Sequence, residues 1–222
     1  MESKSAFACV DKVTRHTDSH HATHAMQNWG ILLMLKIALL VDGWNLLKAA
    51  YRVRRRVNLS ESPHIVVGSH DNRHIVFQRF YVGPITGRNA QQRVGQIAHE
   101  ARAAGFEWVS CATDGGFAKS TVDTQITTDL LTWSYCHSVD VLALREASGD
   151  GGYAEAVQRA KALGLRVGVY AVKASHHLSV ALERSANLIH DLEALDVLQP
   201  DDGDALDGLH EGHAAEGLAV KI

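Results

Sequence analysis

The sequence has few cysteines, nearly balanced charge and no long apolar run. Its three cysteines, Cys9, Cys111 and Cys136, share no spacing typical of a metal site, so we expect reduced thiols in a cytosolic protein. The 22 basic and 25 acidic side chains give a formal net charge of -3. This excludes a global attraction to nucleic acid or membranes and leaves only local contacts with polyanions.

Common targeting and nucleotide-binding signals are also missing. The apolar stretch nearest the N-terminus, residues 31–40, is too short for a transmembrane helix and has no small-residue cleavage site, so we expect neither an anchor nor a signal peptide. No G-x-G-x-x-G or G-x-x-x-x-G-K-[ST] motif follows an expected strand. This counts against a generic Rossmann-like nucleotide-binding protein. A phosphatase with an aspartyl nucleophile would need a second Asp two residues after Asp42, and none is there.

The 222 residues suffice for one domain with tails, and neither a repeat nor an interdomain linker interrupts them. Residues 1–33 are polar and His-rich, so we expect a disordered leader, with Met34 as a second candidate start. Residues 34–192 carry the patterned segments and form the expected domain. Residues 193–222 are acidic and weakly apolar, which predicts a mostly disordered tail.

The central feature is Lys36–Asn45, a short apolar run that stops at Asp42 and is followed by Gly43. A short run rich in Ile, Leu and Val is typical of a strand buried on both faces. Such a strand would place Asp42 at the carboxyl edge of a sheet, where open α/β folds bind ligands.

Strands and helices alternate along the rest of the domain, which predicts an α/β fold with a mainly parallel sheet and helices on both faces. Further strands are expected at 74–82, 106–111, 139–144, 165–172 and 187–191, and helices at 44–56, 89–104, 119–133, 153–163 and 175–185.

The helix expected at 44–56 ends in Arg52, Arg54, Arg55 and Arg56. Cations at a helix C-terminus suit the helix dipole, so a solvated helix end is one interpretation. A patch that contacts phosphate beside the site is the other.

Three carboxylates can reach the same edge of this sheet. Asp42 ends the first strand, Asp150 follows the strand at 139–144 in a Gly-rich turn, and Asp123 lies in the first turn of a helix. If those two strands are neighbours, Asp42 and Asp150 face one cleft. Clustered carboxylates suit Mg²⁺ or Mn²⁺, which can activate water for attack on a phosphodiester. Taken singly, each Asp could equally be a turn or cap residue.

The order of these motifs resembles the NYN domain, in the LabA-like (DUF88) branch of the PIN-like nuclease superfamily. Residues 41–46 (VDGWNL) resemble its V-D-G-x-N-L opening, and residues 119–129 its K-G-V-D-x5-D segment. Residues 148–153 (SGDGGY) resemble its S-G-D-G-D-F turn, and residues 164–167 the G-x-x-V that follows. No single motif is specific, and the resemblance rests on the ordered set, which covers roughly residues 36–192.

The resemblance implies a three-layer α/β/α sandwich of PIN-like or Rossmann-like type and metal-dependent hydrolysis of RNA, with a homodimer as an arrangement that this superfamily allows. Asp42, Asp123 and Asp150 would hold Mg²⁺ or Mn²⁺, and Asn45 would orient Asp42 or a water. Lys119 would neutralise the charge of a phosphate, and Ser148 would form a hydrogen bond within the turn. Asp129 matches a family position as well, but six residues after Asp123 it points about 120° away on a helix.

The sequence departs from the family at two positions. The second acid of the turn is replaced by Gly152, and an acid of a later A-D-x-F/I segment by Asn187. Glu155, one helical turn further on, could reach back toward the gap. Two functions therefore remain: a Mg²⁺- or Mn²⁺-dependent ribonuclease, or a catalytically weakened NYN-like module that binds RNA or a protein partner without cleavage.

Overall fold

A computed structural model describes residues 34–61, 63–64, 73–83, 88–111, 121–145, 151–175, 178–195 and 197–200. The strands are β1 (Leu35–Asp42), β2 (Arg55–Val57), β3 (Arg73–Val82), β4 (Glu107–Ser110), β5 (Val141–Arg145), β6 (Arg166–Ala171), β7 (Leu188–Asp191) and β8 (Leu198–Pro200). The helices are α1 (Gly43–Arg52), α3 (Arg88–Ala103), α4 (Val122–Tyr135), α5 (Ala154–Ala162) and α6 (Val180–Ser185), with 3₁₀ turns η1 (Gly151–Tyr153) and η2 (Lys173–Ser175). Among the described residues, no helix is long and apolar enough to cross a bilayer.

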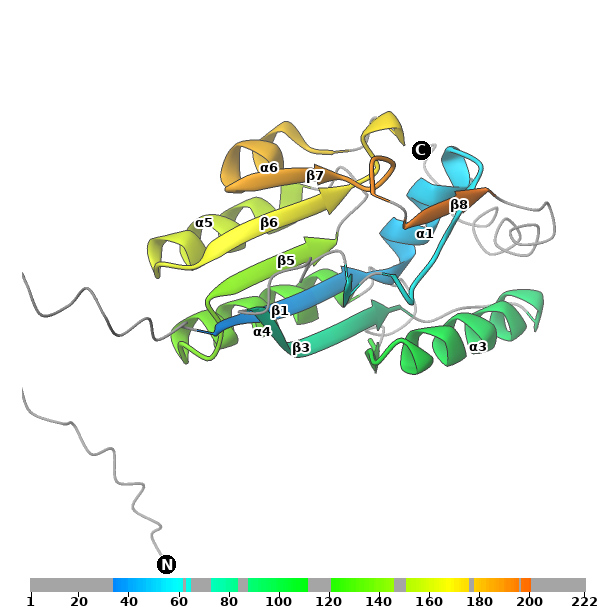
Figure 1. Ribbon diagram of the computed structural model, residues 1–222, viewed down its shortest axis with the longest axis horizontal. Coiled ribbons are helices and arrows are strands. Elements are labelled where there is room, and N and C mark those ends of the chain that lie inside the picture. The colour runs from blue at the N-terminus through cyan, green and yellow to red at the C-terminus, as the bar shows by residue number, and fades with distance from the viewer. Residues whose placement is uncertain are drawn as a thin grey trace, which may run out of the picture. The chain divides into compact units, whose positions relative to one another are not determined.

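Six strands form one sheet in the order β4-β3-β1-β5-β6-β7, and each neighbouring pair is parallel (Figure 1). The chain builds outward from β1 first on one side, through β3 and β4, and then on the other, through β5, β6 and β7. The sheet therefore changes direction at β1, and β1 and β5, the strands that precede Asp42 and Asp150 in the sequence, are neighbours. Such a switch point is where open α/β sheets bind ligands.

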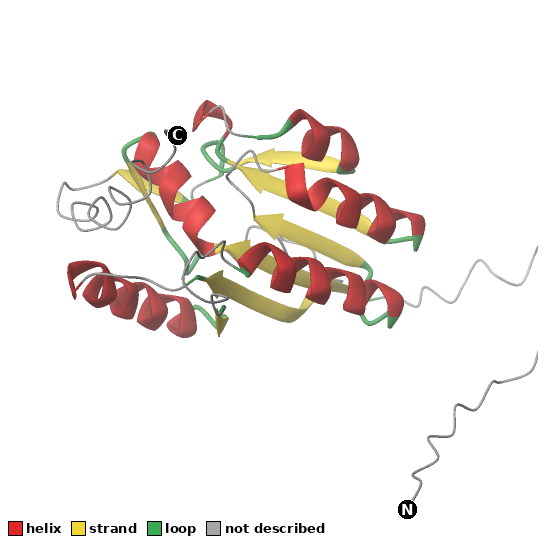
Figure 2. Cartoon of the chain, turned by 180° about the vertical axis from the view of Figure 1, so that it is seen from behind, coloured by secondary structure: helices red, strands yellow, loops and turns green. Residues whose placement is uncertain are grey.

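Both faces of the sheet are covered by apolar clusters. On one face Leu40, Leu142 and Leu144 pack with α4, α5 and α6, the layer nearest the viewer in Figure 2. On the other face Leu39 and Val41 pack with α1 and α3. The alternation along β1 explains this division, because successive side chains of a strand point to opposite faces. The expected α/β fold with a mainly parallel sheet is confirmed.

The helix expected at 44–56 is shorter in the structure and is followed by a strand. α1 ends at Arg52, and Arg54 adopts a positive φ of 53° that turns the chain back. β2 then pairs antiparallel with β8. The prediction of helix through Arg56 was wrong because β2 depends on a partner about 140 residues away, and local periodicity cannot report such a pairing.

The folded unit also continues past residue 192, where the sequence places the start of a disordered tail. Val197 is fully buried among the residues of α1 and α3, and β8 extends the described chain to Pro200. Residues 1–33 and 201–222, including the His-rich segment, lie outside the described residues.

Gly43 is required by the way α1 meets the sheet. A Cβ added at this position would overlap the ring of Phe80 on β3, which lies directly beneath the first turn of the helix. Phe80 is fully buried and stacks on Trp108 with ring centroids 5.4 Å apart, so it has little room to move. The close approach fixes the position of Asp42, the residue before Gly43.

Candidate functional site

Asp42 lies at the carboxyl end of β1, at the switch point of the sheet, and is only 2% exposed. Its side chain also caps α1. Oδ1 accepts a hydrogen bond of 3.0 Å from the backbone N–H of Asn45, and Oδ2 accepts one of 2.7 Å from Asn45 Nδ2. A carboxylate at a helix N-terminus is favoured by the orphan N–H groups and the helix dipole. The sequence Asp-Gly-x-Asn therefore holds the Asp42 carboxylate in one orientation.

Burial raises the pKa of Asp42 from 3.8 to about 6. Loss of hydration is the largest cause, and the negative charge of Asp123 adds to it. The hydrogen bonds from Asn45 and Tyr153 and the charge of Lys48 lower the pKa, but not enough to offset burial. A buried acid that is short of compensating positive charge is a typical feature of functional sites.

Asp123 reaches the same point from the first turn of α4. The hydroxyl of Tyr153 lies 2.7 Å from Asp123 Oδ1 and 3.1 Å from Asp42 Oδ2, so it bridges the two carboxylates. Two of the three acids assigned from the sequence are thus brought together, with these oxygens no more than about 6 Å apart. A tyrosine hydroxyl carries one proton and can donate to only one of them at a time.

Tyr153 is the site residue that the sequence analysis missed. It ends η1 and is 1% exposed, so its ring belongs to the core while its hydroxyl reaches the acids. One signal was present in the sequence, because the family turn that the chain resembles ends in Phe where this chain has Tyr153. The extra hydroxyl lies at the centre of the site.

Asp129 belongs to a different network, and its oxygens have donors already. Oδ2 accepts from Arg79 Nη1 at 2.8 Å and from the Tyr81 hydroxyl at 2.6 Å, and Oδ1 accepts from Gln125 at 3.3 Å. Arg79 is also paired with Glu107 at 2.7 Å. Burial and hydrogen bonding to Asp129 raise the pKa of Tyr81, so this hydroxyl stays protonated. Asp129 is a structural ion-pair partner in this arrangement.

Glu155, the other secondary candidate, is exposed and pairs with Arg159 at 2.6 Å across one turn of α5. The structure therefore does not bring it to Asp42. Asp150, Lys119 and Ser148 lie outside the described residues. Asp150 is in the connection between the end of β5, next to β1, and the start of η1.

The two departures from the family pattern fall at different places. Gly152 immediately precedes Tyr153, so the position at which the family has its second turn acid is next to the site. Asn187 instead precedes β7, at the amino edge of the parallel sheet, where its Oδ1 accepts from the backbone N–H of Val167 at 2.8 Å. Because Asp42 is at the carboxyl edge, the change at Asn187 does not alter the donors around Asp42.

The described donors suit a hard divalent cation. Asp42 and Asp123 offer carboxylate oxygens, the ligands that Mg²⁺ and Mn²⁺ prefer, and no lysine or arginine in the described ranges forms a salt bridge with either acid. Two carboxylates that share one hydroxyl proton are short of positive charge. A search of the described residues alone finds no group of three or more His, Cys, Asp or Glu able to hold a metal ion, so a third acid would have to come from elsewhere in the chain.

Comparison with known proteins identifies one family. A family model described as the NYN domain matches residues 36–193. No curated protein matches the sequence. Among solved structures, the chain is similar to a nicotinamidase from Staphylococcus aureus at 13% identity and a TM-score of 0.29, with 70% of this chain and 99% of that chain covered. A likeness this distant carries no argument about function.

Proposed function

Because this chain belongs to the NYN domain family, a family of PIN-like nucleases, we propose that it is a ribonuclease that depends on Mg²⁺ or Mn²⁺. The convergence of Asp42 and Asp123 on the Tyr153 hydroxyl, at the switch point of the sheet, is the observation that supports this proposal. The order of the motifs further favours the LabA-like (DUF88) branch, and the scarcity of cysteine favours a cytoplasmic protein.

In this proposal Asp42, Asp123 and Asp150 hold the ion. When bound, a divalent ion polarises a phosphoryl oxygen and lowers the pKa of water. Asn45 keeps the Asp42 carboxylate pointing into the site through its two hydrogen bonds. Tyr153 sets the distance between Asp42 and Asp123. Lys119 contacts the phosphate, and Ser148 forms a hydrogen bond within the turn.

The test is RNA cleavage by the full chain carrying Asp42→Asn. We expect cleavage of a labelled single-stranded RNA in Mn²⁺ to fall to the rate measured in EDTA, because the variant loses one negative ligand while the amide still caps α1. Circular dichroism should show an unchanged fold.

Asp140→Asn is the matched control. Asp140 is an exposed acid at the amino edge of the sheet, where it accepts from the backbone N–H of Lys36 at 2.8 Å. This variant should cleave like the wild type. Cleavage that persists in Asp42→Asn, at the wild-type rate and with the same need for Mn²⁺, would refute the assignment.

A second function is favoured by Gly152 and Tyr153 together. The turn lacks one acid of the family pattern, and the Tyr153 hydroxyl bridges Asp42 and Asp123, so a side chain of the protein itself links these two acids. The chain would then be an NYN-like module that binds RNA or a protein partner without cleavage. Titration of Mn²⁺ into the protein, followed by water proton relaxation, separates the two: saturable binding lost in Asp42→Asn supports the nuclease, and its absence supports the module.

A further inference from the structure

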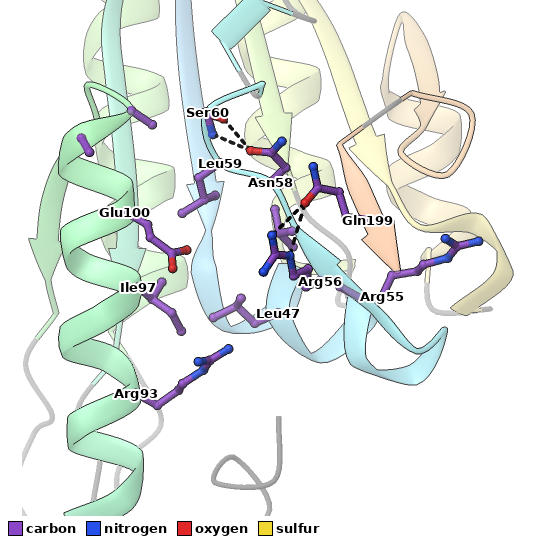
Figure 3. A pocket seen from close by; sticks show the side chains of 14 residues that line it. Leu47, Arg55, Arg56, Asn58, Leu59, Ser60, Arg93, Ile97, Glu100 and Gln199 are labelled. Carbon is purple, nitrogen blue, oxygen red and sulfur yellow. Dashed lines mark hydrogen bonds between the residues drawn. The ribbon is translucent and has the colours of Figure 1, made fainter. Parts of the chain in front are cut away.

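A concave site lies away from the acids, between α1 and α3. It has a volume of about 570 Å³, opens to solvent, and is also lined by β2, residues 58–60 and Gln199 of β8 (Figure 3). This volume falls within the range of small-molecule sites, roughly 300–1,000 Å³. Leu47 contributes to its wall and is five residues after Asp42, about 8 Å along α1.

The charged residues of this pocket are mostly basic: three arginines, Arg55, Arg56 and Arg93, and one glutamate, Glu100. The arginines at residues 52–56 are thus divided between two elements. Arg52 is the last residue of α1, whereas Arg55 and Arg56 lie on β2. Figure 3 shows Arg56 and Arg93 reaching the pocket from opposite walls, Arg56 from β2 and Arg93 from α3.

Arg93 is the most informative of these side chains. Its Nη1 donates to Gln96 Oε1 at 2.9 Å, but its Nε is buried and has no hydrogen-bond partner among the described residues. A buried charged donor without an acceptor is destabilising, and native structures seldom leave one unless a water, ion or ligand completes it.

Arg56 presents a second guanidinium held in place. Its Nε and Nη2 both donate to Gln199 Oε1, at 3.3 and 3.0 Å. This bond fixes the plane of the guanidinium. The N–H pair at the end of the guanidinium, on Nη1 and Nη2, is not used by this contact, and such a pair suits phosphate, which accepts two parallel N–H groups from one side chain.

The rest of the wall is apolar. Leu47, Leu59 and Ile97 line the pocket, and the last two are buried at 4% and 6% exposure. A site with an apolar floor, three arginines and one acid does not suit a simple inorganic anion. It suits a ligand with a flat ring at one end and a phosphate at the other, with Glu100 available to accept from a ring N–H.

We propose that the pocket between α1 and α3 binds a nucleotide, with its phosphate on Arg56 and Arg93 and its base against Leu47, Leu59 and Ile97. The nucleotide is either one residue of an RNA strand or a free mononucleotide. The inference goes beyond the proposed nuclease, because it concerns binding at a site that contains none of the acids assigned to the metal. If the strand is the source, the pocket holds a nucleotide beside the one positioned at Asp42.

Binding is measured on the full chain in EDTA, where cleavage cannot contribute. The two probes are a fluorescein-labelled single-stranded RNA, followed by anisotropy, and uridine 5′-monophosphate, followed by calorimetry. Arg93→Gln and Arg56→Gln should each weaken binding of the responsive probe by about 10-fold, the effect expected for one lost hydrogen bond to a charged group. For RNA, each variant should also lower the slope of affinity against salt by about 1.

Two further variants serve as controls: one removes an arginine outside the pocket, and the other adds bulk to the pocket wall. Arg166→Gln removes an exposed arginine at the amino edge of β6 and should bind both probes like the wild type. Ala103→Phe adds a ring at an exposed lining position and keeps both arginines, so it should weaken binding by excluding the base.

The two arms identify the source of the nucleotide. A response to RNA alone supports a strand, and a response to uridine 5′-monophosphate supports a free nucleotide. Wild-type binding of both probes by Arg93→Gln, Arg56→Gln and Ala103→Phe would overturn the inference. A fall in thermal stability of the arginine variants without any change in binding would also overturn it, because the arginines would then hold a segment of this chain. Asp42→Asn should keep binding while it loses cleavage, so the two proposals fail separately.

Discussion

At the scale of single residues, the site contains acids whose negative charge is not fully compensated by the residues around them. Asp42 is buried with three hydrogen-bond donors around it, yet the pKa of its carboxyl still lies well above the ordinary value. Asp123 adds a second negative charge, and Tyr153 supplies one proton between them. The fold thus tolerates an unfavourable local charge that a bound cation would relieve.

This imbalance predicts how the stability of the metal-free protein depends on pH. Because the folded-state pKa of Asp42 is about 6 and the ordinary value is 3.8, the folded state binds more protons between these values. Stability from this group is therefore present at low pH and falls as pH rises through this window. The charged groups that act on Asp42 are Asp123 and Lys48.

Asp42→Asn should consequently stabilise the chain in EDTA at pH 7.5, by up to about 2–3 kcal/mol. The difference in stability between the variant and the wild type should be smaller at pH 4.5, where Asp42 of the folded wild type is already protonated. Urea denaturation at the two pH values measures both quantities. A variant less stable than wild type at pH 7.5 would contradict this description.

At the scale of elements, the junction of β1 and α1 depends on one close contact. Gly43→Ala should destabilise the domain by about 1–3 kcal/mol, because the added methyl group overlaps Phe80 and forces either the ring or the helix to shift. The shift should also move Asp42 and reduce any cleavage. Thermal unfolding and the RNA assay report the two effects.

Gly95→Ala is the matched control for this prediction. Gly95 lies within α3, and nothing would come within 4 Å of an added Cβ there. The same chemical change should stabilise α3 by about 0.5–1 kcal/mol, since alanine loses less backbone freedom on folding than glycine. We expect the substitution to lower the stability of the protein at Gly43 and to raise it at Gly95. A change of the same sign at both glycines would show that the contact with Phe80 is not decisive.

The spacing of the apolar residues in α4 was enough to predict this helix from the sequence. The apolar positions Val122, Ile126, Leu130 and Trp133 of α4 are all buried, because a 3.6-residue period leaves few alternatives. β2 and Tyr153 were not predictable in the same way. β2 exists only through its pairing with β8, and the role of Tyr153 depends on three elements meeting at one hydroxyl, which no local pattern encodes.

At the scale of the whole described domain, β8 holds a distant part of the chain in place. A chain that stops at residue 193, where the family match ends, lacks β8 and Val197. We expect it to be less stable than a chain that stops at residue 200 by about 1.5–3 kcal/mol, the value of burying one valine side chain. Urea denaturation of the two chains measures the difference. Equal midpoints and slopes would show that β8 does not belong to the cooperative unit.

The bond between Arg56 and Gln199 joins residues 143 positions apart, and this has a consequence for the order in which the protein forms. Closing so long a loop is slow and entropically unfavourable until other contacts have shortened it. During synthesis, β1, α1 and Asp42 are made before the wall that contains Gln199. The pocket between α1 and α3 is therefore completed only after that wall is made, and a chain interrupted before residue 199 would carry Asp42 and Asp123 without it.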